Sequence, residues 1–261
     1  PILSGLVGSE MCIRDRSMIE GTGQNGRITK QDVTSLVSTS QSEVVPQSEP
    51  STHTSGSNRQ RMSGIRLAIA KSMSESWSQV PHVTNFDKAN MTQLKAIRQK
   101  YGSTIAKGKL TVTALMIKIS AVALQKFPQF NSSLDLDNKE IIYHKDINIG
   151  IAVDTEQGLL VPVIKKAQDK NLLQISEELG EISVKARDGH LTLADMQDGT
   201  FTISNLGGIG GTNFTPIVKL PEVAILGLSR SQIEPIWSAD EESFKPVEMM
   251  PLALSLSLIH I

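Results

Sequence analysis

Cysteine is almost absent from this 261-residue chain, which contains Cys12 and no other. A single thiol excludes a disulfide framework and any CxxC metal or redox motif, and it is typical of a reducing compartment. An excess of charge of one sign is also missing, because 26 Lys and Arg residues face 27 Asp and Glu residues for a net charge of −1. The chain as a whole therefore has no positive field to hold nucleic acid or an anionic membrane surface.

Long apolar runs and metal-binding patterns are lacking too. The most hydrophobic stretch, residues 110–127, is interrupted by Lys118 and Lys126, so it falls short of the roughly 18 apolar residues that span a bilayer. The histidines are scattered without the spacing of HExxH, and we expect no metal site. They are His53, His82, His144, His190 and His260.

The two ends of the chain differ from the rest. Residues 1–16 show neither a helical nor a strand period, and they lack the apolar core of a signal peptide. GSEMCIRDR near the start and LSLIHI at the end resemble translated adapter sequence found at the ends of chains assembled from environmental reads. We expect residues 1–16 and 256–261 to be non-native, in which case Cys12 goes with them and a cysteine nucleophile is excluded; the alternative is a genuine ragged terminus.

Two short segments precede the main domain. Residues 17–37 combine a glycine-rich loop with a helix that Thr29 can cap, which is typical of half of a very small domain. Residues 38–58 are rich in Ser and Thr, contain two prolines and have no aromatic residue. Such a composition buries too little apolar surface to offset its ordering entropy, so a flexible linker is predicted.

Residues 59–255 alternate helical and strand patterns, which predicts an α/β fold whose helices cover a mixed sheet. The predicted helices are one that Ser63 caps and that ends before Pro81, residues 93–100 capped by Thr92, one from Thr111 or Thr113 through Phe127, and one from Leu172 that Gly189 closes. The predicted strands are residues 141–144, 147–154, 159–165, 200–206, 223–229 and 247–255. The third helix is apolar nearly all round, so we expect it at the centre of the core.

Several long motifs occur along the chain, beginning with GTGQNGRITKQDV and, after the linker, RMSGIRLAIAKSM. The first resembles the second half of the peripheral subunit-binding domain of the dihydrolipoyl acyltransferases of 2-oxoacid dehydrogenase complexes, and the second follows the linker as in that family. INIGIAVDTEQGLLVPVIK, TFTISNLGGIGGTNFTPI and PEVAILGLSRSQIEPIW resemble the catalytic domain, in the order the family has them. The residues of PHVTNFDKAN and GGTNFTPIV are more similar to the acyltransferases of the pyruvate complex than to the succinyl or branched-chain enzymes.

The resemblance implies a fold similar to chloramphenicol acetyltransferase and acyl transfer between dihydrolipoamide and coenzyme A, without a metal. Lipoic acid would be carried on lipoyl domains that this chain does not contain. The implied partners are the pyruvate decarboxylase and dihydrolipoyl dehydrogenase components, and further copies in a homotrimer with the site between subunits. Neither nucleic acid nor a membrane is implied, and the location would be the bacterial cytoplasm or, in a eukaryote, the mitochondrial matrix.

The same resemblance assigns site residues. Ser204 in TFTISN matches the serine that stabilises the oxyanion, whereas the residues alone would favour a strand hydroxyl bonded to a neighbouring carbonyl. The family's base lies in a His-x-x-x-Asp-Gly motif, but His260 is not followed by Asp-Gly, so we expect this chain alone to be inactive. Arg27 matches a basic position that binds partner subunits; an ordinary solvated arginine is the alternative.

Alternative interpretations of the chain and of two of its features are weighed as follows. A non-catalytic scaffold of the same family, or a succinyl or branched-chain acyltransferase, would share most of these motifs. The glycines between residues 207 and 211 suggest a phosphate cradle, but neither a lysine nor a helical pattern follows them, so close backbone approach is favoured. His82 is expected to be structural rather than catalytic.

Overall fold

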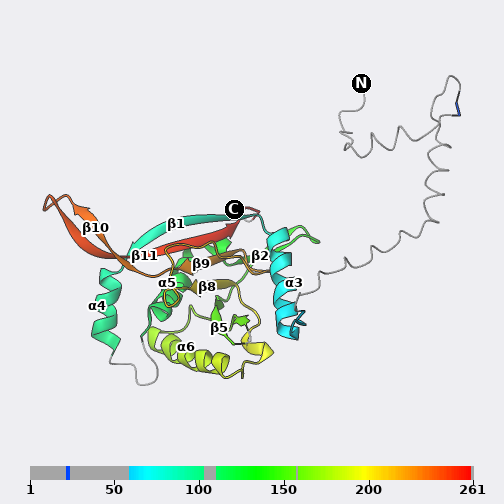
Figure 1. The fold of residues 1–261 in the computed structure, drawn as a ribbon, viewed down its shortest axis with the longest axis horizontal. Helices are drawn as coiled ribbons and strands as arrows, with labels where there is room; N and C mark the ends of the chain where they lie inside the picture. Colours follow the sequence, from blue (N-terminus) through cyan, green and yellow to red (C-terminus); the bar gives the residue numbers. More distant parts are fainter. Residues whose placement is uncertain (1–21, 24–58, 103–109, 157, 260–261) are drawn as a thin grey trace. The chain divides into compact units, whose positions relative to one another are not determined.

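The computed structural model describes residues 22–23, 59–102, 110–156 and 158–259 (Figure 1). Two compact units are present, residues 1–60 and 61–261, and every helix and strand below belongs to the second. The predicted half-domain and linker, residues 17–58, lie outside the described part of the chain except for residues 22 and 23. Among the described helices, none is long and apolar enough to cross a membrane.

Helices and strands alternate along the second unit (Figure 1). The α-helices are α3 (Gly64–Gln79), α4 (Thr92–Tyr101), α5 (Val112–Lys126) and α6 (Leu172–Arg187), and the short 3₁₀ helices are η3 (Pro128–Phe130) and η4 (Leu193–Asp195). The strands are β1 (His82–Asn90), β2 (Ser132–Asp135), β3 (Glu140–Tyr143), β4 (Ile149–Ile151), β5 (Val153–Thr155), β6 (Gly158–Leu160), β7 (Val163–Ile164), β8 (Phe201–Asn205), β9 (Ala224–Leu228), β10 (Gln232–Ser238) and β11 (Ser243–Ser257).

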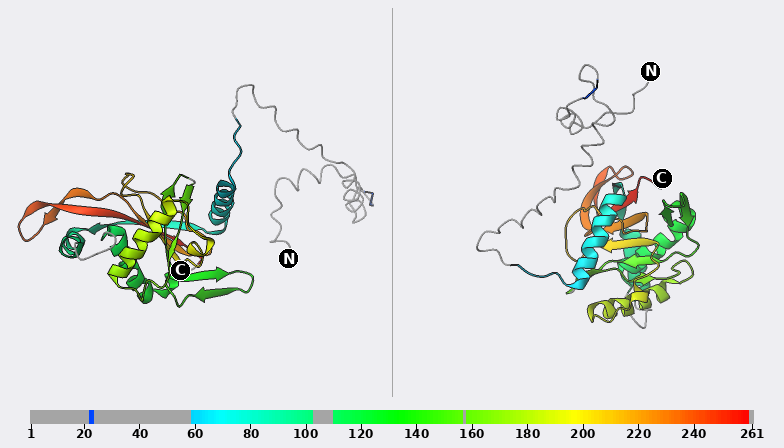
Figure 2. Two further views of the ribbon diagram at one scale, coloured as in Figure 1. Left: turned by 90° about the horizontal axis from the view of Figure 1, so that it is seen from below. Right: turned by 90° about the vertical axis from the view of Figure 1, so that its right-hand side faces the viewer.

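A seven-stranded mixed sheet organises the unit. Its strand order is β1-β11-β9-β8-β4-β7, and β10 pairs with β11 beside this path. Strand β8 runs parallel to both β4 and β9, while the other pairs are antiparallel. The β10–β11 hairpin extends away from the body of the domain (Figure 2). The predicted α/β fold with a mixed sheet is confirmed.

The two faces of the sheet are covered differently. Alternate side chains of a strand point to opposite faces, and in β8 Phe201 and Ile203 join the main core with α5 and α6. Thr202 and Ser204 point to the other face, where they line a cavity that helix α3 also bounds. Strand β8 therefore connects the hydrophobic core to the candidate site.

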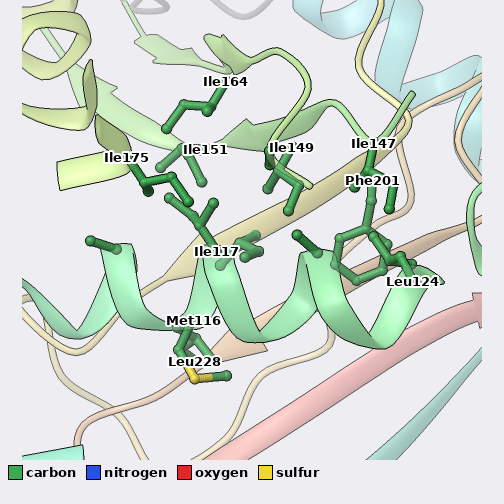
Figure 3. Close-up of a cluster of buried hydrophobic side chains, with 14 of the residues drawn as sticks. Met116, Ile117, Leu124, Ile147, Ile149, Ile151, Ile164, Ile175, Phe201 and Leu228 are labelled. Carbon is green, nitrogen blue, oxygen red and sulfur yellow. The ribbon is translucent and has the colours of Figure 1, made fainter. Parts of the chain in front are cut away.

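Helix α5 supplies much of the core, as its sequence predicts. The Thr111 hydroxyl accepts a hydrogen bond from the Ala114 amide at 3.1 Å, which settles the capping residue. Ile117 is fully buried and points toward the isoleucines of β4 (Figure 3). Burial of such a side chain contributes about 1.5–3 kcal/mol. Not every apolar side chain of this central helix is buried, because Ile119 and Val122 are each 45 % exposed.

Two predicted strands are each divided in two. The stretch 147–154 forms β4 and β5 with a break at Ala152, whose amide donates to the Ile203 carbonyl of β8. The stretch 159–165 forms β6 and β7 with a break before Val163, where Pro162 has no amide hydrogen to donate to a ladder. Periodicity alone does not mark either break.

Other details correct the sequence-based expectations. Thr92 is the first residue of α4 rather than its cap; Met91 holds the N-cap position, and the Asn90 side chain accepts from the Thr92 amide at 2.9 Å. Strands β1, β2 and β10 were not predicted: β1 and β10 are largely exposed, and β2 is four residues long and begins with two buried serines.

Strand β11 is longer than predicted and includes Leu256 and Ser257. Both residues are buried, and they pair with Val83 and His82 of β1. These two residues therefore belong to the sheet; the non-native origin of residues 256–261 stays a prediction.

Candidate active site

Ser204 lies near the carboxyl end of β8, at the centre of the sheet. Ser204 pairs in register with Gly227 of β9. Two residues earlier in β8, Thr202 pairs in register with Gly150 of β4. The Ser204 side chain is half-buried, and its hydroxyl makes no hydrogen bond within the described ranges. A strand hydroxyl without a carbonyl partner is free to bind a ligand.

A cavity of about 510 Å³ opens in front of this hydroxyl. Its walls come from α3, from the end of β6, from residues 214–217 and from β9, and most of the lining side chains are apolar. An apolar site from which water is excluded strengthens any hydrogen bond made inside it. The cavity therefore suits a small acyl group whose polar atom meets Ser204.

Phe214 forms part of the cavity wall because of a glycine in the sheet. A Cβ atom at Gly227 would lie 2.7 Å from Phe214 Cζ, closer than real Cβ contacts allow. Gly227 is the cross-strand partner of Ser204, so the missing side chain lets the aromatic ring pack directly over the strand beside the serine. Any larger residue at position 227 would displace the ring.

Glu222 is the most unusual ionisable group near this cavity. Only 3 % of the residue is exposed, and burial raises the pKa of its carboxyl to about 7. Thr202 and Lys219 oppose this increase in pKa. Nevertheless neither Glu222 Oε2 nor Thr202 Oγ1 completes a hydrogen bond within the described structure.

No histidine among the described residues lines the Ser204 cavity. The ring of His82 stacks on Trp77 at 5.7 Å, and its Nε2 accepts a hydrogen bond from the Val218 amide at 2.9 Å. His144 Nε2 lies 3.0 Å from Ser133 Oγ. Both rings thus have structural partners, while His260 lies outside the described residues.

Two of the glycines after β8 use their backbone amides within the chain. The amides of Gly207 and Gly210 donate to Asn205 Oδ1 and to the Leu206 carbonyl, so they are already used. The Arg230 guanidinium donates to the Gly207 carbonyl at 3.1 Å. The amides of Gly207 and Gly210 are therefore not available to a phosphate group.

Two remaining expectations concern metal and partner binding. The described residues contain no group of three or more His, Cys, Asp or Glu side chains that could hold a metal ion. Arg27 lies outside the described residues, and its partner-binding role stays a prediction.

Residues 54–257 match the model of the 2-oxoacid dehydrogenases acyltransferase (catalytic domain) family. The chain belongs to this family. The dihydrolipoyllysine-residue acetyltransferase component of the pyruvate dehydrogenase complex of Buchnera aphidicola (strain APS) is 43 % identical over 246 residues, covering 91 % of this chain and 62 % of that protein. The component of the same name from Haemophilus influenzae is 40 % identical over 263 residues, covering 91 % and 46 %. The chain thus spans about half to three fifths of these acyltransferases.

Solved acyltransferase structures share the fold. One comes from work on a serine, a histidine and an asparagine in the catalytic mechanism of Azotobacter vinelandii dihydrolipoamide acetyltransferase; it is 44 % identical with a TM-score of 0.75, over 78 % of this chain and 84 % of that one. Another is the cubic core of the pyruvate dehydrogenase multienzyme complex, 43 % identical with a TM-score of 0.76, over 80 % and 86 %. The sequence-based assignment to the acyltransferases is confirmed.

Sequence reasoning overlooked Glu222 and Phe214. The sequence does hold a signal for Glu222, because this charged residue lies between Pro221 and the apolar run of β9. A carboxyl next to a buried strand is expected to be buried as well. The position of Phe214 over Gly227 had no such signal, since only the fold brings the two together.

Proposed function

We propose that this chain is the catalytic domain of an acetyltransferase that moves an acetyl group between dihydrolipoamide and coenzyme A in a pyruvate dehydrogenase complex. One observation carries the proposal. The Ser204 hydroxyl has no hydrogen-bond partner among the described residues, and it faces a mostly apolar cavity of about 510 Å³. Relatives at 40–43 % identity that bear this name support the acetyl specificity. The complex would work in the bacterial cytoplasm, or in the matrix of a eukaryotic mitochondrion.

The residues support a division of roles. One thiol attacks the acetyl carbonyl, a base takes its proton, and the carbonyl oxygen gains negative charge in the tetrahedral intermediate. Ser204 would donate a hydrogen bond to this oxygen, and the intermediate would then expel the other thiolate, which takes up the proton. The base would be a histidine that does not belong to the described residues lining this cavity.

Activity with three acyl donors tests this proposal. The full-length protein, given dihydrolipoamide, is expected to use acetyl-CoA in preference to succinyl-CoA and isobutyryl-CoA, as measured by release of the CoA thiol. The chain printed here is expected to show no turnover, because it lacks the His-x-x-x-Asp-Gly motif. Preference for a larger acyl group would replace the acetyl assignment with a succinyl or branched-chain one.

A non-catalytic scaffold is the second candidate function. It is favoured by the lack of a histidine among the described residues that line the Ser204 cavity. A full-length protein that assembles and binds its partners but transfers none of the three acyl groups would establish it. Carriage of lipoyl groups and binding of the decarboxylase and dehydrogenase components are part of either candidate.

The exposed face of α5 supports assembly with further copies of the chain. Ile119 and Phe127 are 45 % and 52 % exposed and border an apolar groove of about 370 Å³. We expect the full-length protein to form trimers or larger assemblies in sedimentation velocity, and Ile119→Asp to weaken them by placing a charge in the groove. Leu136→Asp is the control, since Leu136 is 65 % exposed in the β2–β3 turn, outside the groove. A stable wild-type monomer would contradict the expectation.

A further inference from the structure

One wall of the 510 Å³ cavity continues into a segment that belongs to no strand or helix. Residues 214–217 line the cavity, and residues 218–220, the bridging segment, follow them before β9 begins. Val218 is fully buried and packs with Val80 and Ile225. A buried backbone amide outside a strand ladder needs an acceptor from another part of the chain, because an unpaired amide destabilises the fold.

Two side chains where α3 meets β1 supply such acceptors. His82 Nε2 accepts a hydrogen bond from the Val218 amide at 2.9 Å, and Ser76 Oγ accepts one from the Leu220 amide at 3.2 Å. Ser76 is fully buried, whereas the other residues of α3 are at least partly exposed. Alternate residues of the bridging segment are therefore attached to the same corner of the fold.

Helix α3 bounds the same cavity. Four of its side chains belong to the lining: Ala68, Ile69, Ser72 and Met73. The cavity thus has one wall on α3 and another on residues 214–217, which lead directly into the bridging segment. The spacing of these two walls depends on the hydrogen bonds that Ser76 and His82 accept.

The contact at His82 requires a neutral imidazole. An imidazolium carries a proton on both ring nitrogens and cannot accept a hydrogen bond. The His82 side chain is half-buried, so solvent protons have access to it. Trp77 stacks on the ring with 5.7 Å between the centroids, which places an optical probe beside the group that titrates.

No carboxylate holds the charged form of this ring within the described ranges. The nearest ionisable side chains along the adjoining elements are Glu75 on α3, Asp87 on β1, Lys219 on the bridging segment and Glu248 on β11. His82 forms an ion pair with none of them. Its protonation therefore breaks the bond to the backbone without forming a salt bridge in its place.

We propose that His82 is a positioning residue for the candidate active site, whose neutral ring holds residues 214–217 at a fixed spacing from α3 and whose protonation releases this wall. The inference rests on the proposed acyl transfer. When the ring takes up a proton, the buried Val218 amide loses its acceptor and the bridging segment shifts. Substrate binding then weakens, while Ser204 keeps its place on β8. An interaction that supports the ground state and the transition state equally affects KM and leaves kcat nearly unchanged.

Steady-state kinetics of the full-length protein test this role. His82→Leu removes the acceptor but keeps an apolar side chain beside Trp77. At about pH 8 it is expected to raise the KM of acetyl-CoA, of dihydrolipoamide or of both roughly five- to tenfold, with kcat within about twofold of wild type. His82→Gln supplies a neutral carbonyl acceptor and should restore the wild-type KM. The control His190→Leu removes an exposed imidazole after α6 and should change neither constant.

The pH dependence of KM separates His82 from the general base. Between about pH 8 and about pH 5.5, protonation of the base lowers kcat in wild type and in every variant. Over the same interval the wild-type KM should rise towards the value of His82→Leu. The KM of His82→Gln should stay constant, because a carboxamide does not titrate. A purely structural role of His82 would alter stability without making KM depend on pH.

Two measurements on the chain printed here require no turnover. Trp237→Phe leaves Trp77 as the chain's single tryptophan, and its emission should fall on acidification, because a protonated imidazole quenches a stacked indole. His82→Gln in the same background should abolish this quenching. The Val218 amide should exchange its hydrogen faster in His82→Leu than in wild type, and at the wild-type rate in His82→Gln.

The outcomes distinguish the inference from the proposed function. An active full-length wild type whose KM is unaffected by His82→Leu, or equally pH-dependent in His82→Gln, would overturn the inference alone. Unchanged exchange of the Val218 amide would do the same. If His82→Leu fails to fold, the pH profile of His82→Gln and the Trp77 titration decide. A full-length wild type without acetyl transfer would overturn the proposed function and this inference together.

Discussion

Replacing Ser204 with alanine is expected to slow acetyl transfer by the full-length protein about 10²- to 10³-fold, a loss of roughly 3–4 kcal/mol in transition-state stabilisation. The hydroxyl has no competing partner among the described residues, so it is available to the thioester oxygen. Its hydrogen bond strengthens as that oxygen becomes an oxyanion, and its loss should therefore lower kcat while KM changes little. Steady-state kinetics with acetyl-CoA and dihydrolipoamide measure both constants.

Two variants show whether the effect belongs to Ser204. Ser183→Ala removes a hydroxyl that donates to the Leu179 carbonyl on α6 and should leave kcat unchanged. Thr202→Val tests the neighbouring hydroxyl on the same strand face. If Thr202→Val abolished turnover while Ser204→Ala retained it, the oxyanion donor would be Thr202. If neither variant changed the rate, the acetyltransferase proposal would be wrong.

The second large effect concerns stability and pH. The pKa of Glu222 is about 7 in the folded chain against 4.5 as the ordinary value. Below pH 4.5 both the folded and the unfolded chain keep the proton, so the carboxyl has no effect on the free energy of unfolding. Between pH 4.5 and 7 the unfolded chain loses the proton first, and stability falls by about 3 kcal/mol in total. Above pH 7 the penalty is constant.

Glu222→Gln should remove this penalty. Relative to wild type, the variant is expected to gain about 3 kcal/mol between pH 4.5 and pH 8, measured by urea unfolding at each pH. The comparison requires no catalytic activity, so the chain printed here suffices. Glu181→Gln provides the exposed control. A gain that was equal at both pH values would mean that Glu222 ionises normally in the folded state.

Much of the fold could be predicted from local pattern. Ser63 and Asn171 cap their helices with side-chain oxygens, although only the first was identified from the sequence. The apolar strands β8 and β9 were predicted within a residue or two of their observed ends. Strand β1 lies at the edge of the sheet and was not predicted. Many of its side chains are exposed and polar, so its sequence shows little hydrophobic alternation.

The candidate site could be predicted only in part. Ser204 was named from a motif, and Thr202, two residues earlier in β8, lies on the same face. The partners that give the site its character come from distant segments. Phe214 reaches Gly227 and Glu222 reaches Thr202 only after β8 and β9 pair, and neither contact leaves a trace in local periodicity.

The chain's tryptophans both lie on the surface, which decides what fluorescence can report. Trp77 is 67 % exposed on α3, where it stacks on His82. Trp237 is 54 % exposed on the projecting β10–β11 hairpin, with its ring edge-to-face against Phe244 at 5.1 Å. Emission from these indoles will therefore change little when the core unfolds, and circular dichroism is the better probe of unfolding. A blue shift of the Trp237 emission would instead signal that another molecule covers the hairpin.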